Sequence, residues 1–179
     1  DVGFGKTEVA MNAMLAVILD GYQAIFVCPT TLLATQHYHS MQKRFSEFGI
    51  SIAKLDGKTP AKEKTHIKKG LESGEIKLVI GTHSLLEIKT NNLALVIIDE
   101  EHKFGVKQKE KLKHLREDVH IFSMSATPIP RTLNLALSKL KGMSSLLTPP
   151  TERLGVRTYV KEFSDKLIKE VVLREKRRG

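Results

Sequence analysis

Short apolar runs alternate with helical patterns along this chain, and this alternation constrains the fold more than any other feature. The runs are rich in β-branched residues and bounded by polar or turn residues, as is typical of strands buried on both faces of a sheet. We expect strands at residues 24–27, 77–80, 94–98 and 120–124, with a weaker candidate at 50–55.

Helical patterns fill the segments between these strands. Residues 6–19 carry apolar side chains at the spacing of one helix face. Further helices are expected at 31–48, 60–73, 107–116 and 131–140, and a charged helical tail at 164–178. Strands that alternate with helices predict an α/β fold, with a mainly parallel sheet and helices on both faces. Ligands of such sheets bind beyond the carboxyl ends of the strands, so the chemical residues should follow the strands.

Composition limits the class of protein. The 179 residues carry a formal net charge of +9, which permits a polyanionic partner such as nucleic acid. No apolar run approaches the roughly 18 residues that span a bilayer, so we expect no membrane partner. The single cysteine, Cys28, excludes a disulfide framework and a Cys-rich zinc site, and it fits a reducing cytoplasm. The chain opens on Asp1 with no leader sequence, and we expect it to be a piece of a longer protein.

A phosphate-binding loop is expected at the start of the chain. Residues 1–7 read Asp-Val-Gly-Phe-Gly-Lys-Thr and lead directly into the first predicted helix. They match the end of the G-x-x-x-x-G-K-[ST] pattern, whose first glycine would precede Asp1. Glycines let backbone amides turn toward phosphate oxygens at a helix N-terminus. Lys6 would then reach the terminal phosphates and Thr7 would bind Mg²⁺; the alternative is a glycine-rich turn that caps a helix.

An acidic motif follows the apolar run at 94–98, which leads directly into Asp99-Glu100-Glu101-His102. Asp99 can hold Mg²⁺ through water, and Glu100 can act as general base toward the attacking water. The alternative is a solvated acidic loop. We therefore expect ATP and Mg²⁺ as cofactors, with Glu100 and Lys6 as catalytic residues. The predicted nucleotide-binding residues are Gly3, Phe4, Gly5, Lys6, Thr7, Glu8, Asp99 and Glu100.

Further short motifs occur in a fixed order. Residues 29–34 resemble motif Ia of superfamily 2 helicases, 81–83 resemble motif Ic, 99–102 form a DExH box, and 125–127 (Ser-Ala-Thr) resemble motif III. The strings DVGFGKTE, DEEHKFG and ATPIPRT resemble the motor of the bacterial transcription-repair coupling factors and of the related RecG branched-DNA helicases. The string PPTERLGV favours the coupling factors.

This resemblance implies a RecA-like P-loop NTPase domain at 1–148, the first lobe of a motor, and a linker at 149–179 that leads to a second RecA-like lobe. It implies an ATP-dependent translocase on double-stranded DNA in the bacterial cytoplasm, with RNA polymerase and excision-repair proteins as partners. The second lobe of such motors supplies arginines to the γ-phosphate, so we expect this chain alone to bind ATP weakly and hydrolyse it poorly. The DNA contacts would be Thr30, Thr31, Gly81, Thr82 and His83, and the coupling residues would be His102, Ser125, Ala126 and Thr127.

Several alternatives stay open. The motor could remodel branched DNA in the manner of RecG, or the chain could be a P-loop phosphotransferase or a module that holds nucleotide without catalysis. Thr30 and Thr31 could cap a helix, and His83 could be a packed loop residue. The lysine runs at 54–69 and 103–116 could steer DNA or form solvated helix faces. His37 and His39 share no metal-ligand spacing with other residues, and the sequence suggests only surface or core positions for them.

Overall fold

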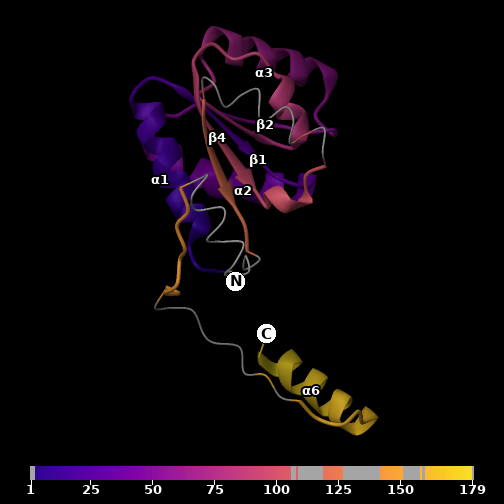
Figure 1. Cartoon of the computed structure of the whole chain (residues 1–179). Helices are drawn as coiled ribbons and strands as arrows, with labels where there is room; N and C mark the ends of the chain where they lie inside the picture. The colour runs from indigo at the N-terminus through magenta and orange to yellow at the C-terminus, as the bar shows by residue number, and fades with distance from the viewer. Residues whose placement is uncertain are drawn as a thin grey trace.

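The computed structural model describes residues 3–105, 108, 119–126, 142–150, 158 and 160–178. In these residues five strands form one sheet in the order β2-β3-β1-β4-β5, and every pairing is parallel (Figure 1). The strands are β1 Gln23–Val27, β2 Ile52–Leu55, β3 Leu78–Gly81, β4 Leu93–Asp99 and β5 His120–Met124. The predicted parallel α/β sheet is confirmed, and each expected strand occurs within two residues of its expected bounds.

Helices precede, connect and follow these strands along the chain. They are α1 Lys6–Leu19, α2 Thr31–Phe45, α3 Ala61–Ser73 and α6 Asp165–Arg178, with short 3₁₀ turns η1 Ser46–Phe48, η2 His83–Glu87 and η3 Glu101–Lys103. The expected helix at 31–48 ends its α-helical part at Phe45 and continues as η1. The expected helices at 131–140 and, but for residue 108, at 107–116 lie outside the described residues.

Two apolar layers cover the two faces of the sheet. Phe26 of β1 packs with buried residues of α1 and α2, including Met14 and Met41. Its neighbours in the strand point the other way, so Ile25 belongs to the layer that contains Leu71 of α3. All five residues of β1 are buried, which explains why this strand reads as a continuous apolar run rather than as an alternation. The predicted cover of helices on both faces is confirmed.

A buried amide anchors the amino-terminal end of β1. Gln23 is 1% exposed, and its Nε2 donates to the carbonyls of Leu71 (2.9 Å) and Ile76 (2.7 Å). Its Oε1 accepts from the amides of Asn91 and Asn92, each at 2.9 Å. This single side chain therefore ties β1 to the end of α3 and to the turn before β4.

The charged tail forms the expected helix, α6. The boundary at 148/149 between a lobe and a linker remains a prediction. Across the described part of the chain, the helices are too short or too polar to cross a bilayer.

Candidate functional site

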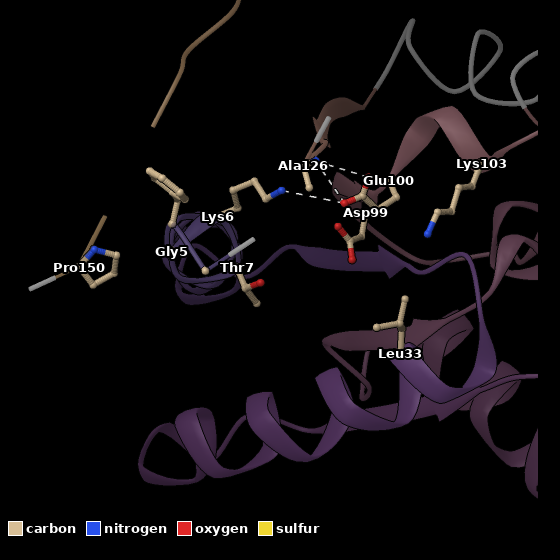
Figure 2. Close-up of a pocket in the computed structure, with 11 residues that line it drawn as sticks. Gly5, Lys6, Thr7, Leu33, Asp99, Glu100, Lys103, Ala126 and Pro150 are labelled. Carbon is tan, nitrogen blue, oxygen red and sulfur yellow. Dashed lines mark hydrogen bonds and ion pairs between the residues drawn. The ribbon is translucent and has the colours of Figure 1, made fainter. Parts of the chain in front are cut away.

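A cleft of about 520 Å³ opens at the carboxyl edge of the sheet and joins the two motifs that the sequence placed far apart. The glycine loop before α1 lies on one side of the cleft and the end of β4 on the other (Figure 2). The described lining residues are Gly3, Phe4, Gly5, Lys6, Thr7, Leu33, Asp99, Glu100, Lys103, Ala126 and Pro150. The site therefore lies where parallel sheets bind ligands.

The glycine loop has the backbone that a phosphate cradle needs. Gly3 and Gly5 have φ values of 82° and 83°, a region that residues with a Cβ rarely adopt. Gly5 is the N-cap of α1, and its carbonyl accepts from the amides of Glu8 and Val9. The amino end of α1 thus begins at the cleft, where its amides and dipole favour an anion.

Glu100 occupies a strained position directly after β4. It is the only non-glycine residue with positive φ (55°) among the described residues, and its amide donates to the carbonyl of Met124 at 2.9 Å. Such strain persists only where surrounding contacts hold the residue, and it marks functional sites. The backbone turn brings the carboxylate to 3.9 Å from Lys6 Nζ.

Residues of the segment after β5 and of η3 hold the Glu100 carboxylate in place. The amide of Ala126 donates to Oε1 at 3.2 Å and to Oε2 at 3.4 Å (Figure 2). Ser125 Oγ donates to Oε2 at 3.5 Å, and His102 Nδ1 lies 3.2 Å from Oε2. Ser125 Oγ and His102 Nδ1 are 3.4 Å apart. Three of the predicted coupling residues therefore gather around the predicted base, whereas Thr127 lies outside the described residues.

Asp99, the other predicted acidic ligand, is contacted from α2. Its Oδ2 lies 3.4 Å from His37 Nε2, and both side chains are 15% exposed. The imidazole packs against the ring of Phe26 at a centroid distance of 4.8 Å. Sequence reasoning assigned no role to His37. Its spacing from Ala34 and Met41, both fully buried, is the available signal, because it puts a polar ring on the buried face of a helix.

The donor set at the cleft fits ATP with Mg²⁺. The Thr7 hydroxyl and the Asp99 carboxylate line the same cleft, and hard oxygen donors are the ligands that Mg²⁺ prefers. Lys6 and Lys103 supply positive charge beside them. Lys103 appeared in the sequence only as part of a lysine run, and its place on η3 beside Glu100 could not be read from that run.

Glu8 lies outside the described lining of the cleft. Its predicted role in nucleotide binding stays a prediction. Its Oε1 accepts a hydrogen bond from Arg44 Nη2 at 2.9 Å, and both side chains are about half exposed. Glu8 follows Thr7 by one residue on α1, so the helix turns its side chain toward α2 instead.

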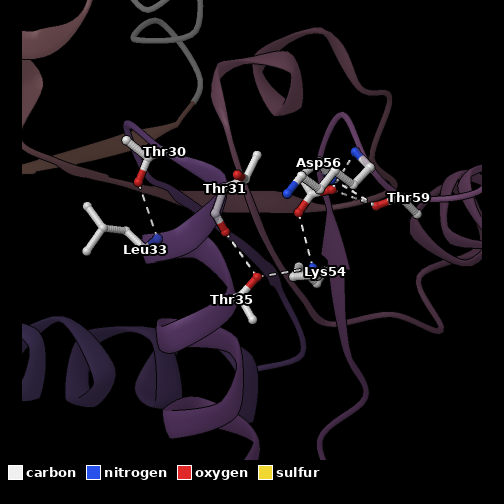
Figure 3. A network of polar contacts seen from close by, with 8 residues as sticks. Thr30, Thr31, Leu33, Thr35, Lys54, Asp56 and Thr59 are labelled. Carbon is white, nitrogen blue, oxygen red and sulfur yellow. Dashed lines mark hydrogen bonds and ion pairs between the residues drawn. The ribbon is translucent and has the colours of Figure 1, made fainter.

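The predicted DNA residues follow β1 and β3, which are neighbours in the sheet. Thr30 Oγ1 accepts from the amide of Leu33 at 3.3 Å, so the capping alternative is present (Figure 3). The Thr31 carbonyl accepts from Thr35 Oγ1. Thr82 precedes η2, and exposed His83 begins it. Thr30 and Thr31 thus lie at the start of α2 and Thr82 and His83 at the start of η2, and their contact with DNA remains a prediction.

Two buried residues nearby have structural explanations. A Cβ at Gly81 would stand 1.9 Å from the Leu55 carbonyl oxygen, so close approach of β2 and β3 demands glycine there. Cys28 is fully buried, as expected. Burial, and secondarily the charge of Asp99, raises the pKa of the Cys28 thiol to about 12.

Comparison with known proteins assigns the class. Residues 1–136 match the model of the DEAD/DEAH box helicase family. The chain therefore belongs to the DEAD/DEAH box helicases.

Particular relatives narrow this assignment. The chain is 56% identical over 179 residues to a transcription-repair-coupling factor of Helicobacter pylori strain J99, and 45% identical over 181 residues to that of Escherichia coli K12. All of the chain is covered in both, but only 18% and 16% of these relatives. A solved RecG bound to a three-way DNA junction matches with a TM-score of 0.80 and 40% identity, over 100% of this chain and 24% of that one. The predicted resemblance and the RecA-like fold are confirmed.

Proposed function

We propose that this chain is the ATP-binding lobe of a motor that moves along double-stranded DNA. The observation that carries the proposal is the single cleft that joins the glycine loop at Gly3–Thr7 to Asp99 and Glu100. Glu100 within it is held by the segment after β5. A nucleotide in this cleft would touch groups from α1, from the end of β4 and from the segment after β5 together.

Each side chain has a definite task in this proposal. The loop amides and Lys6 would bind the phosphates of ATP, while Thr7 and, through water, Asp99 would hold Mg²⁺, which would neutralise phosphate charge. Glu100 accepts a proton from the attacking water. The Lys6–Glu100 pair at 3.9 Å opens as Lys6 turns to the phosphates, and this leaves the Glu100 carboxylate to accept that proton.

Coupling to DNA would pass through the groups that hold Glu100. His102 and Ser125 both contact its Oε2, so a movement of Ser125 and Ala126 would change the position of the base. Thr30, Thr31, Thr82 and His83 follow neighbouring strands, and their hydroxyls and amides suit phosphate oxygens of a DNA backbone.

The finer proposal follows from the relatives. The chain is 56% identical to one transcription-repair-coupling factor. We therefore infer that the intact protein uses this motor to remove stalled RNA polymerase. A second RecA-like lobe and excision-repair proteins would then be its partners in the bacterial cytoplasm. The second candidate is remodelling of branched DNA, which the 40% identity to a junction-bound RecG favours.

Mutation of Glu100 in the full-length protein tests the proposed chemistry. We expect Glu100→Gln to lower the DNA-stimulated kcat for ATP by about 10²–10⁴-fold with ATP binding retained. The matched control is Glu101→Gln, which removes the adjacent charge and should keep wild-type turnover. Equal turnover of Glu100→Gln and wild type would exclude Glu100 as the base.

A second assay separates the two DNA tasks. The full-length protein is given ATP with either a stalled RNA polymerase or a three-way DNA junction. Displacement of the polymerase supports the coupling-factor assignment, and resolution of the junction alone supports the RecG-type alternative.

A further inference from the structure

We propose that His37 is a positioning residue that holds the Asp99 carboxylate and thereby sets the strength of metal binding in the cleft. This inference rests on the proposed function, because it takes Asp99 to hold Mg²⁺ in the cleft, through water. His37 lies outside all the motifs that the sequence singled out.

The two acidic side chains of the cleft are held by different parts of the fold. Glu100 accepts hydrogen bonds from the amide of Ala126 and from Ser125, and it contacts His102. Asp99 is contacted from the opposite side of the strand end, by His37 of α2 at 3.4 Å from its Oδ2. The positions of the carboxylates therefore depend on separate elements, and α2 acts on Asp99.

His37 is itself held in place. Its ring lies against Phe26, tilted at 49° with centroids 4.8 Å apart, and Phe26 is fully buried in β1. Ala34 and Met41, one turn before and one turn after His37 on α2, are also fully buried. The imidazole is 15% exposed and cannot swing away from Asp99 without leaving this packing. A nitrogen held so firmly is a fixed partner for a carboxylate.

A fixed partner reduces the conformational entropy that the Asp99 side chain loses when a metal binds. A free aspartate side chain must give up rotamer freedom when it binds a metal, whereas one already restrained loses less. Groups that contact a ligating carboxylate orient it, and their removal commonly weakens metal affinity by about 10–100-fold. If His37 were only a core residue, its loss would lower stability and leave metal affinity unchanged.

Binding of Mn²⁺ to the full-length protein distinguishes these roles. Mn²⁺ replaces Mg²⁺ as a spectroscopic probe, and its dissociation constant is measured by electron paramagnetic resonance with a non-hydrolysable ATP analogue present. We expect His37→Leu to raise this constant about tenfold. His37→Gln should stay near wild type, because its amide nitrogen reaches the place of the imidazole Nε2. His39→Leu, the same change at an exposed position of the same helix, should have no effect.

The shorter His37→Asn keeps the comparison informative if the leucine variant fails to fold. Asparagine is polar but does not reach Asp99, so it should weaken Mn²⁺ binding while glutamine does not. Wild-type Mn²⁺ affinity in a folded His37→Leu or His37→Asn protein would overturn the role of His37 and leave the proposed function intact. A wild-type protein that binds no Mn²⁺ with the nucleotide would overturn both.

Discussion

At the scale of single residues, Gly81 has two candidate explanations, close packing of two strands and contact with DNA. The motif resemblance assigned it to DNA contact, yet its backbone lies so close to Leu55 that a methyl group cannot fit. Overpacking against a backbone atom forces strands apart. We therefore expect Gly81→Ala to destabilise the β2–β3 pair by about 1–3 kcal/mol, without reference to any nucleic acid.

Hydrogen exchange of the β2 and β3 amides measures this local loss. Gly57→Ala is the matched control, because a Cβ at Gly57 meets nothing within 4 Å and that change should leave protection unchanged. Equal protection in the two variants would contradict the steric explanation.

Asp56 gives a second prediction at this scale, through its acidity. Its side chain accepts from Lys54 Nζ at 3.1 Å, from the Lys58 amide at 2.8 Å and from the Thr59 hydroxyl at 3.3 Å (Figure 3). Burial alone would raise the pKa of Asp56, but these hydrogen bonds and the charge of Lys54 together lower it. The folded carboxylate therefore stabilises the protein above its unfolded pKa, and this contribution is lost as pH falls through the folded pKa.

Replacement of Lys54 by Met should raise the pKa of Asp56 and shrink that contribution. Lys58→Met is the control, since only the backbone amide of Lys58 binds Asp56, and the pKa should stay low. A titration of the Asp56 carboxyl carbon by NMR reads both. An unchanged pKa in Lys54→Met would show that the lysine is not what holds the carboxylate ionised.

At the scale of elements, we expect the stability of the contacts between β1, the end of α3 and the turn before β4 to depend on the Gln23 side chain. Gln23→Leu would leave buried carbonyls and amides of the α3 end and of the turn before β4 without their partner, at a cost of about 2–4 kcal/mol. The midpoint of urea unfolding should fall accordingly. Gln36→Leu, at an exposed position on α2, should leave it within error, and a comparable fall in both would argue against the buried network.

Gln23 and the strands differ in how far they could be predicted from the sequence. Strands such as β1 were predictable because burial on both faces leaves a run of apolar residues. The end of α2 was misplaced by three residues because η1 continues the same pattern. Gln23 and His37 were missed because their partners lie far away in the chain, and no local spacing reports such contacts. Asp99 and Glu100 were found because they follow a strand directly.

At the scale of the whole molecule, the chain spans less than a fifth of the length of the coupling factors it resembles, 18% in one case. The described lining of the cleft explains why this matters. Its cationic side chains are Lys6 and Lys103, and it includes no arginine. An arginine that reaches the γ-phosphate contributes about 10³–10⁵-fold to hydrolysis in P-loop GTPases. We expect the described lining to bind ATP without offering an arginine to its γ-phosphate.

We therefore expect the 179-residue chain on its own to hydrolyse ATP at least about 10³-fold more slowly than the full-length protein. The physical reason is that the cationic side chains in the described lining are lysines, Lys6 and Lys103, and no arginine there meets the transition-state charge on the γ-phosphate. Steady-state ATP turnover of the two proteins, with and without DNA, measures the ratio, and Glu100→Gln in the full-length protein sets the background. Turnover by the chain that matches the full-length protein would mean that its own residues complete the catalytic site.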